Sequence, residues 1–478
     1  MNLRASSAPI LSPEQLWPWG RTLLAAALGV SLLGVLFLAW KLPEALFLTP
    51  LVILAGFGAA LLCRHPLANL FVLLVGFVCI ADKQAGFQIQ EVLYGLCFFG
   101  YMGYWFVTRS LSHKEAIFEY PEDRMLGGLL LWTVPAFALV FVFHGDASMA
   151  FKEWEGLLML SVYFPVREAC VRYRNGTRVI MTAFFVICVF VILRNLWEYH
   201  TDLVSAIHVW QVKRERVNTN DNVLMAASVI SLTLLVFAEQ WRTRLTLLAF
   251  FLLAFLGLIL TLSRGYWVAF AVGAMGLFLI VEKRQKRRMI LFALYGAAGM
   301  ILIGTVFFGD LMSTVLSGLQ TRFTSIGTST TQDPSVINRL LEAKAVWTWI
   351  ATNPIMGYGL GVPYHFYDMN YDFTMVRSFM HNAYLSLWYR FGIFGLLLVL
   401  YFWATVIFRG VQAFRIRHAE RLVRVCGLAA GCALLAFTVS ALTSNPFVND
   451  DHLYLLGFLA GLASGTSRRA QQQTAAVA

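Results

Sequence analysis

Long apolar segments separated by short polar stretches follow one another along almost the whole chain. A transmembrane helix needs about 20 mostly apolar residues. The pattern therefore predicts an all-α polytopic membrane protein with 12–14 transmembrane helices. The predicted segments are 22–40, 45–62, 67–81, 90–107, 126–143, 154–166, 179–198, 222–238, 244–262, 265–281, 289–309, 383–408, 425–443 and 452–466.

Residues 154–166 form the weakest of these segments, because they are few and begin beside Glu153 and Glu155. A half-span and an interfacial helix are both consistent with this pattern. Residues 22–40 run on into further apolar segments without a small-residue cleavage site, so we expect a retained anchor rather than a cleaved signal.

Composition agrees with the pattern, since 59% of the residues are hydrophobic, 13% are charged and the mean hydropathy is +0.68. The net charge of +11 would fit nucleic acid, but the basic residues lie mostly in short loops, where they set topology. We therefore expect no nucleic-acid partner. The seven cysteines include no CxxC pair, so neither a disulfide framework nor a thiolate metal site is indicated.

The distribution of positive charge predicts the orientation. If residues 1–21 are cytoplasmic and the segments alternate, about two thirds of the 37 basic residues lie on the cytoplasmic side, as the positive-inside rule requires. Both termini are then cytoplasmic and the polar stretch 310–382 lies outside. The predicted organisation is a helical part (1–309), a large periplasmic loop (310–382) and a C-terminal helical part with a cytoplasmic tail (383–478).

The long polar stretch has its own local signals. Asn338-Arg339 leads into a helical pattern, and Asn353-Pro354 is followed by a cluster of glycines at 357, 359 and 361. These signals predict one or two short helices and a turn folded over the membrane face. Loops of this length in compact proteins tend to be functional.

His381-Asn382, followed after nine residues by Gly392-Ile393-Phe394-Gly395, closes this stretch. A histidine can accept a proton near neutral pH, and this one stands where the chain re-enters the membrane. The two glycines permit close approach by another backbone or by a substrate. An ordinary role at a helix start, with Asn382 as its cap, is the alternative. His365, which lies among aromatic residues, is a second candidate for packing or for acceptor contact.

Arginines on the same predicted outer side indicate an anion site. Arg264 lies in a tight turn between two apolar runs, Arg216 lies in the outer loop 199–221, and Arg194 stands near the outer end of its segment. Snorkelling to the interface is the alternative for Arg264, although we favour the anion site there, and a solvated charge run is the alternative for Arg216. Arg339 either pairs with Glu342 one turn later or joins the anion site.

The remaining signals limit the chemistry. We find no phosphate-binding glycine loop and no His/Glu group with metal-ligand spacing, so we expect neither a metal nor another cofactor. Outside the cytoplasm there is no ATP, so a bond-forming enzyme there needs a donor that is already activated. Sugars linked to a lipid diphosphate are such donors.

These residues resemble the bacterial O-antigen ligase and polymerase superfamily of membrane glycosyltransferases. The resemblance is best over about 210–410. It rests on the large outer loop, on His381-Asn382 with Gly392 and Gly395, on Ser263-Arg264-Gly265, and on Asn353-Pro354 followed by Gly357-x-Gly359.

The resemblance implies a fold related to the GT-C class in the bacterial inner membrane, with the site facing the periplasm. It also implies metal-independent, inverting transfer of a glycan from undecaprenyl diphosphate to lipid A core. His381 then matches the motif histidine, and Arg264 and Arg216 match arginines that hold the diphosphate. The family usually has Gly and Asn-Pro-Asn after the loop arginine, whereas Val217-Asn218-Thr219-Asn220 follows Arg216, so Arg214 and Arg216 both remain candidates.

Two alternatives stay open. A polymerase of O-antigen or exopolysaccharide repeat units would use a growing polysaccharide as its acceptor, in place of lipid A core. A transporter of lipid-linked glycans would make no bond and would place its charged site near the bilayer midplane. The intramembrane residues Arg194 and Arg390 fit either class.

Overall fold

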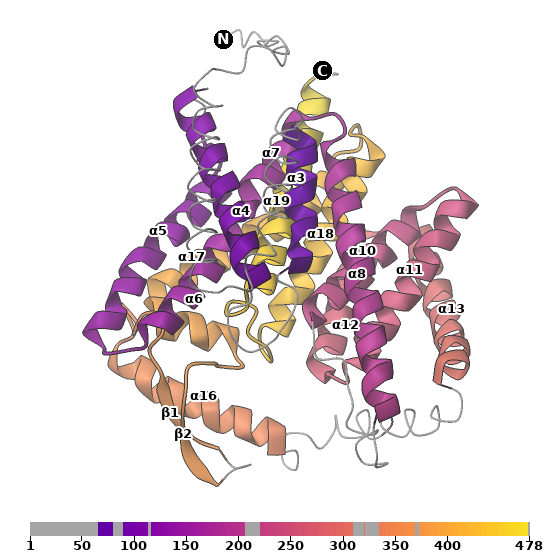
Figure 1. The fold of residues 1–478 in the computed structure, drawn as a ribbon. Coiled ribbons are helices and arrows are strands. Elements are labelled where there is room, and N and C mark those ends of the chain that lie inside the picture. Colours follow the sequence, from indigo (N-terminus) through magenta and orange to yellow (C-terminus); the bar gives the residue numbers. More distant parts are fainter. Residues whose placement is uncertain are drawn as a thin grey trace. The chain divides into compact units, whose positions relative to one another are not determined.

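In a computed structural model of the protein, the described residues are 66–79, 89–112, 116–205, 220–308, 320, 334–368 and 372–476. This part of the chain is mostly helical, as Figure 1 shows. Five of its helices are long and apolar enough to cross a membrane, and three shorter ones are also apolar. The chain is therefore a multi-pass α-helical membrane protein, as the sequence predicted. The predicted segments 22–40 and 45–62 lie outside the described residues.

The helices of the described part agree closely with the apolar pattern. For example, the predicted segment 222–238 is observed as α10 (Asp221–Phe237), and 265–281 as α12 (Arg264–Ile280). The other helices are α3 (Pro66–Val75), α4 (Ile89–Val107), α5 (Pro121–Val142), α6 (Ala147–Leu158), α7 (Tyr163–Arg172), α8 (Gly176–Ser205), α11 (Trp241–Leu260), α13 (Lys283–Phe308), α16 (Pro334–Thr352), α17 (Ala383–Arg415), α18 (Arg421–Ser440) and α19 (Asp450–Ala475).

The chain divides into two compact units, and the larger comprises residues 74–86 and 118–478. In the smaller unit, 1–73 with 87–117, the described part is helical, and the Tyr94 hydroxyl donates a hydrogen bond to the carbonyl of Leu73 at 3.1 Å.

The weak segment 154–166 is a broken helix rather than a single span. Helix α6 ends at Leu158, a 3₁₀ turn covers Met159–Val162, and α7 continues from Tyr163. This broken helix packs closely against α19, on which three glycines are spaced four residues apart. A Cβ atom added at Gly457, Gly461 or Gly465 would lie 2.6–2.7 Å from a carbonyl oxygen of the broken helix. Small residues at this spacing permit such close approach in membranes.

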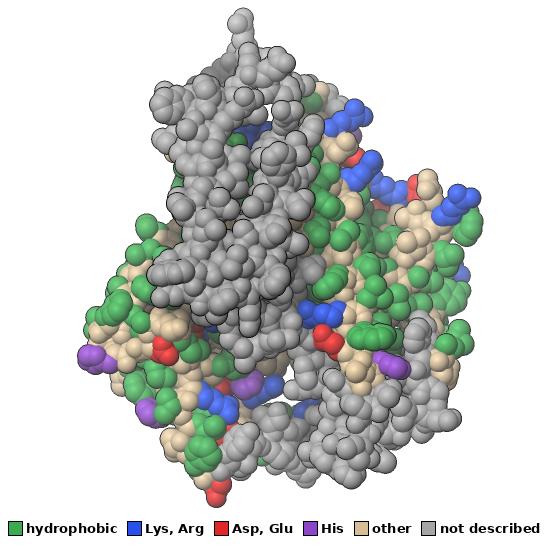
Figure 2. Space-filling view, in the orientation of Figure 1, with side chains coloured by type: hydrophobic (Ala, Val, Ile, Leu, Met, Phe, Trp, Pro, Cys, Tyr) green, Lys and Arg blue, Asp and Glu red, His purple; other side chains and the backbone are tan. Residues whose placement is uncertain are grey.

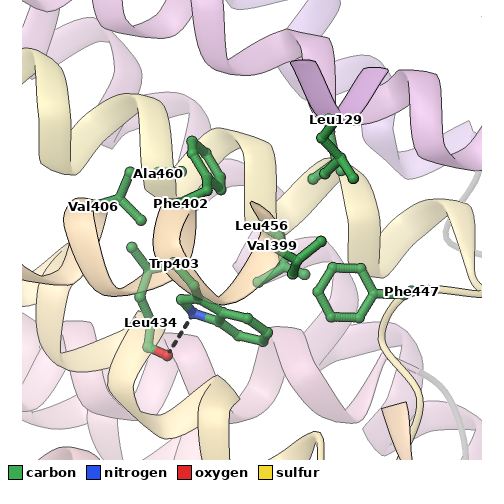
Figure 3. A pocket seen from close by; sticks show the side chains of 10 residues that line it. Leu129, Val399, Phe402, Trp403, Val406, Leu434, Phe447, Leu456 and Ala460 are labelled. Atoms are coloured by element: carbon green, nitrogen blue, oxygen red, sulfur yellow. Dashed lines mark hydrogen bonds between the residues drawn. The ribbon is translucent and has the colours of Figure 1, made fainter. Parts of the chain in front are cut away.

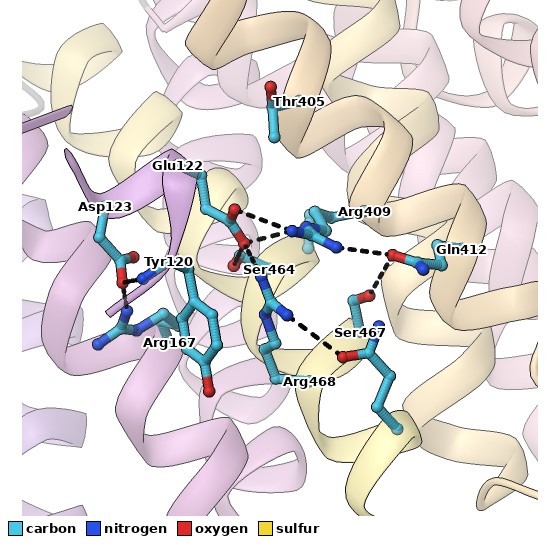
Figure 4. Close-up of polar contacts among 12 residues, drawn as sticks. Tyr120, Glu122, Asp123, Arg167, Thr405, Arg409, Gln412, Ser464, Ser467 and Arg468 are labelled. Atoms are coloured by element: carbon cyan, nitrogen blue, oxygen red, sulfur yellow. Dashed lines mark hydrogen bonds and ion pairs between the residues drawn. The ribbon is translucent and has the colours of Figure 1, made fainter. Parts of the chain in front are cut away.

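A buried network of charges joins four helices at the end where α5 begins (Figure 4). Glu122 accepts hydrogen bonds from Arg409 on α17, at 3.0 and 3.1 Å, and from Arg468 on α19, at 3.0 Å. Next to it, Asp123 pairs with Arg167 of α7. Both carboxylates are fully buried, so each depends on these partners for its charge.

The positively charged helix ends gather at this same end of the unit. Arg415 ends α17 and Arg421 begins α18, while the guanidinium of Arg288 on α13 donates to the carbonyl of Val236 at the end of α10, at 3.1 Å. Figure 2 shows Lys and Arg side chains along the upper right of the visible face. The basic residues at these helix ends thus lie at one end of the unit, as the charge pattern along the sequence predicted. Which side of the membrane this end faces stays a prediction.

Helix α16 lies across the opposite end of the larger unit, together with a β-hairpin (Figure 1). Strands β1 (Tyr364–Asp368) and β2 (Phe373–Arg377) pair antiparallel, with Tyr364 opposite Arg377 and Asp368 opposite Phe373. The sequence had predicted only short helices and a turn here. The difference arises because each strand has five residues, too few for alternation to stand out in a stretch rich in aromatic residues.

The interior between α5, α17, α18 and α19 is apolar and well filled. A cavity of about 20 Å³ remains there, and the polar Nε1 of Trp403 beside it donates to the carbonyl of Leu434 at 3.2 Å (Figure 3). Packed membrane helices have such interiors. The cavity is lined by Leu129, Leu160, Val399, Phe402, Trp403, Val406, Leu434, Phe447, Leu456 and Ala460.

Candidate active site

His381 is held by a buried carboxylate from α16. Its Nδ1 lies 3.1 Å from Oε2 of Glu342, and its backbone N–H donates to the same oxygen at 3.0 Å. The carboxylate is an acceptor, so Nδ1 carries the hydrogen, and in the neutral ring Nε2 then keeps its lone pair. The side chain of His381 is 33% exposed, against 5% for Glu342. The arrangement thus fixes one edge of the imidazole and leaves the other open as a base.

Tyr364 of β1 completes the support of this pair. Its hydroxyl lies 2.8 Å from Oε1 of Glu342 and 2.8 Å from the carbonyl of Phe379, so the hairpin is tied to the segment before His381. Burial disfavours the charged form of Glu342, but hydrogen bonds from His381 and Tyr364 outweigh it and lower the pKa of this carboxyl. Burial next to Glu342 raises the pKa of Tyr364, which keeps its proton.

The lowered pKa of Glu342 predicts an acid-labile contact. A carboxyl with a depressed folded pKa stabilises the fold above its ordinary pKa, and this contribution is lost as the pH falls through the folded value. We expect amide hydrogen exchange in α16 to accelerate in that acid range, and Glu342→Gln to lack this added acid dependence. Glu282→Gln, at an exposed position, is the matched control. Equal acid dependence in wild type and Glu342→Gln would contradict the assignment.

Asn382 begins α17 as its N-cap. The side-chain Oδ1 accepts hydrogen bonds from the backbone N–H groups of Tyr384, at 3.0 Å, and Leu385, at 3.1 Å. This satisfies two of the N–H groups that a helix start leaves unpaired. The motif residue next to the histidine therefore has a structural role. From the sequence, Asn382 is also expected to contact the loop or the acceptor, as are Gly392 and Gly395, and the contact with an acceptor stays a prediction.

Gly392 breaks α17 in a backbone conformation that glycine alone adopts readily, with φ 65° and ψ −174°. The segment after Asn353-Pro354 enters this break. A Cβ added at Gly392 would lie 1.8 Å from the carbonyl oxygen of Ile355, so the two backbones touch. Close backbone approach at this glycine was predicted and is confirmed. Gly395 lies one turn later, where an added Cβ would meet the side chain of Phe391 at 2.2 Å.

The glycine cluster of the loop makes the complementary contacts. The N–H groups of Tyr358 and Gly359 donate to the carbonyls of Tyr389 and Arg390, at 2.7 and 3.0 Å. The break leaves these carbonyls without partners inside the helix. The two sequence motifs, Asn353-Pro354 with its glycines and His381-Asn382 with Gly392, are therefore one structural unit.

A buried ion pair locks this unit to α6. Nε of Arg390 donates to Oε2 of Glu153 at 2.9 Å, and the N–H of Gly361 donates to the same oxygen at 3.0 Å. Nη2 of Arg390 also reaches the carbonyl of Ser378 at 2.9 Å, three residues before His381. Arg390, considered above as an intramembrane charge, is a paired residue that connects the helix to the segment carrying the histidine.

The start of α12, where Arg264 lies, and the start of α17 contact the same turn at the end of α18. The N–H of Ala383 donates to the carbonyl of Ala441 at 2.9 Å, and Gly265 packs against Thr443, whose Oγ1 lies 2.1 Å from the position of an added Cβ. Arg264 and His381 thus lie at the same end of the unit. The sequence placed them on one side of the membrane, and the helix packing brings their segments together.

Arg194 belongs to a polar chain at the starts of α10 and α19. Its Nη2 donates to Oδ1 of Asn220 at 2.9 Å, and Nδ2 of Asn220 donates to Oδ2 of Asp451 at 2.6 Å. Asn222, two residues further on, donates to the Tyr266 hydroxyl on α12 at 3.3 Å. The starts of α10, α12, α17 and α19 therefore surround the end of α18, and their macrodipoles all turn a positive end toward this region.

For the other predicted arginines, the described residues give fewer contacts that place them near His381. Arg339 lies on α16 one turn before Glu342, on the same side of the helix. Arg216 and Arg214 lie outside the described residues. His365 is exposed on β1 and stacks on Trp349, with ring centroids 6.4 Å apart.

Glu342 is the site residue that sequence reasoning missed as a partner of His381. A signal was present, because Glu342, Val346 and Ile350 recur every four residues and form the buried stripe of α16. A carboxylate in such a stripe needs a buried partner.

The family comparison agrees with this geometry. Residues 248–400 match the O-antigen ligase family. This segment begins within α11 and includes Arg264, α16, the hairpin and the His381-Asn382 motif. The protein is thus a multi-pass membrane protein that carries an O-antigen ligase domain over these residues, and the resemblance drawn from the sequence is confirmed there. No curated protein sequence matches the chain.

Proposed function

We propose that the protein is an inverting, metal-independent glycosyltransferase that moves a glycan from undecaprenyl diphosphate to a sugar hydroxyl of lipid A core at the periplasmic face of the inner membrane. One observation carries the proposal. A half-exposed histidine, held at Nδ1 by a buried carboxylate, stands within a matched O-antigen ligase segment. A base oriented in this way suits proton removal from a hydroxyl.

In the proposed reaction, Nε2 of His381 accepts the proton of the acceptor hydroxyl. The hydroxyl oxygen attacks the anomeric carbon of the donor glycan from the face opposite the diphosphate. The bond between that carbon and the diphosphate oxygen breaks, and its electron pair leaves with the diphosphate. Glu342 stabilises the imidazolium that forms and holds its orientation.

The leaving diphosphate gathers negative charge, which arginines and helix N-termini at the His381 end of the unit can offset. Arg264 at the start of α12 is the first candidate to bind it, with Arg194, Arg339 and Arg216 as further ones. The convergence of four helix starts supports this choice, because the positive ends of their dipoles favour anions. Such preorganised charge stabilisation is worth about 3–4 kcal/mol per donor in comparable sites.

Proteoliposomes with the purified protein test the function. Supplied with the undecaprenyl-diphosphate-linked glycan and lipid A core, they should form a glycan–lipid A product of inverted configuration and release undecaprenyl diphosphate. EDTA should leave the rate unchanged. Movement of the donor across the bilayer without bond formation would instead indicate a transporter.

A deletion strain separates ligation from polymerisation. Loss of polymer on lipid A, with lipid-linked polymer accumulating, is the result expected for a ligase. Accumulation of single lipid-linked repeat units would show a polymerase and would overturn the choice of acceptor.

A further inference from the structure

The β-hairpin has two unlike faces. Tyr364, Phe366 and Asp368 of β1 are buried toward α16, while His365 and Tyr367 between them are exposed. Because directly paired residues share a face, Val376 and Thr374 of β2 lie beside His365 and Tyr367. We call these four residues, His365, Tyr367, Thr374 and Val376, the outer face of the hairpin.

The outer face combines aromatic rings with hydrogen-bonding groups. His365 stacks on Trp349 of α16, with an angle of 24° between the ring planes, so the aromatic surface extends from the helix onto the strand. Tyr367 is 47% exposed, and its hydroxyl is hydrogen-bonded to the carboxylate of Asp372 at the hairpin tip. Flat rings beside hydroxyl and carboxylate groups match a sugar, which has apolar C–H faces and a rim of hydroxyls.

This composition favours a carbohydrate over a lipid surface. A lipid-facing hairpin would carry the carboxylate of Asp372, whose partner is the neutral Tyr367 hydroxyl, toward the bilayer, where a charged side chain is costly. In contrast, the exposed edge of α16 has the residues of a lipid contact, with Leu340 57% and Trp347 51% exposed, and Trp347 packs against Trp388 at the membrane end of α17.

Strand β1 connects the outer face to the histidine. Tyr364, which donates a hydrogen bond to Glu342, and its neighbour His365 lie on opposite faces of this strand. At the far end of the strand, Asp368 accepts from Arg377 at 2.9 Å and from Asn338 of α16 at 2.9 Å, so the hairpin is fixed to the helix that carries Glu342. A glycan bound on the outer face therefore has a defined position relative to the base.

We propose that the outer face of the hairpin, with Trp349, is a binding subsite for the acceptor oligosaccharide, in which Tyr367 and His365 stack against sugar rings and Asp372 accepts their hydroxyls. This inference rests on the proposed function, since it assigns the sugar acceptor of that reaction a place to bind. The subsite sets acceptor affinity, while His381 performs the proton transfer.

Binding without turnover tests the subsite. The probe is the delipidated core oligosaccharide released by mild acid from the lipopolysaccharide of the source bacterium, titrated into the full-length protein in detergent. Tyr367→Ala should raise the Kd about tenfold, the loss of one aromatic contact, and the acceptor KM by the same factor with kcat unchanged. Tyr367→Phe, which keeps the ring, should stay within about twofold of wild type. Leu340→Ala, on the exposed edge of α16, should not change the Kd.

The outcomes separate the two proposals. Transfer by the wild type together with an unchanged oligosaccharide Kd in Tyr367→Ala overturns the subsite and leaves the reaction standing. Tyr367-dependent binding of the oligosaccharide without any bond formation supports the subsite and overturns the transferase. A Tyr367→Ala variant that binds the oligosaccharide normally but loses activity only in liposomes shows that the face contacts lipid, which also overturns the subsite.

Discussion

His381→Ala is expected to lower kcat for glycan transfer by about 10²–10⁴-fold, the range for loss of a general base. Glu342→Gln should lower it by about 10²-fold, because the amide still accepts a hydrogen bond but no longer balances the charge of the imidazolium.

The measurement is transfer by purified variants in proteoliposomes, with equal amounts of protein that elutes as one species in detergent. His418→Ala is the matched control, because His418 is exposed between α17 and α18, at the opposite end of the unit. If the double variant His381→Ala/Glu342→Gln were much slower than His381→Ala alone, the two residues would act independently, contrary to the geometry.

Gly392→Ala should destabilise the protein by about 2–5 kcal/mol. Two costs add here: a backbone conformation that alanine resists, and a methyl group placed 1.8 Å from the carbonyl oxygen of Ile355. Relief of this overlap requires the loop at 353–361 to leave the break in α17, so we also expect faster proteolysis within that loop and a loss of transfer.

Thermal unfolding in detergent and limited proteolysis measure this effect. Gly128→Ala on α5 is the control, because an added Cβ there meets nothing within 4 Å. That substitution should be neutral or stabilise by up to about 1 kcal/mol through helix propensity. A Gly392→Ala protein with wild-type stability would show that the loop does not depend on the break.

The sequence predicted the helices well because each is encoded locally, by the length of an apolar run and the polar residues that end it. It also found the two motifs. It did not show that the loop glycines enter the break at Gly392, since the hydrogen bonds from Tyr358 and Gly359 join segments that the pattern treats separately. Likewise, it did not show the pairing of Glu153 with Arg390, because more than 200 residues separate the two in the chain.

The partners of buried charges were the least predictable part of the site. Asp368 lies in a polar stretch where acidic residues are usually solvated, yet it is buried between Asn338 and Arg377. Glu342 was considered only as a neighbour of Arg339 along one helix, because spacing in the sequence reports local neighbours and not those brought in by folding. The role of Arg216 stays a prediction.

The interlocking of the glycine loop with the break in α17 restricts how such proteins can exchange parts. A chimaera joined between residues 361 and 383 would combine a loop from one parent with a break shaped for another. Because Ile355 and Gly392 touch through their backbones, even conservative differences in loop length would leave carbonyls unpaired. Under the proposed function, we therefore expect acceptor preference to be transferred more readily by exchanging residues 334–395 as a block than by grafting the polar stretch alone.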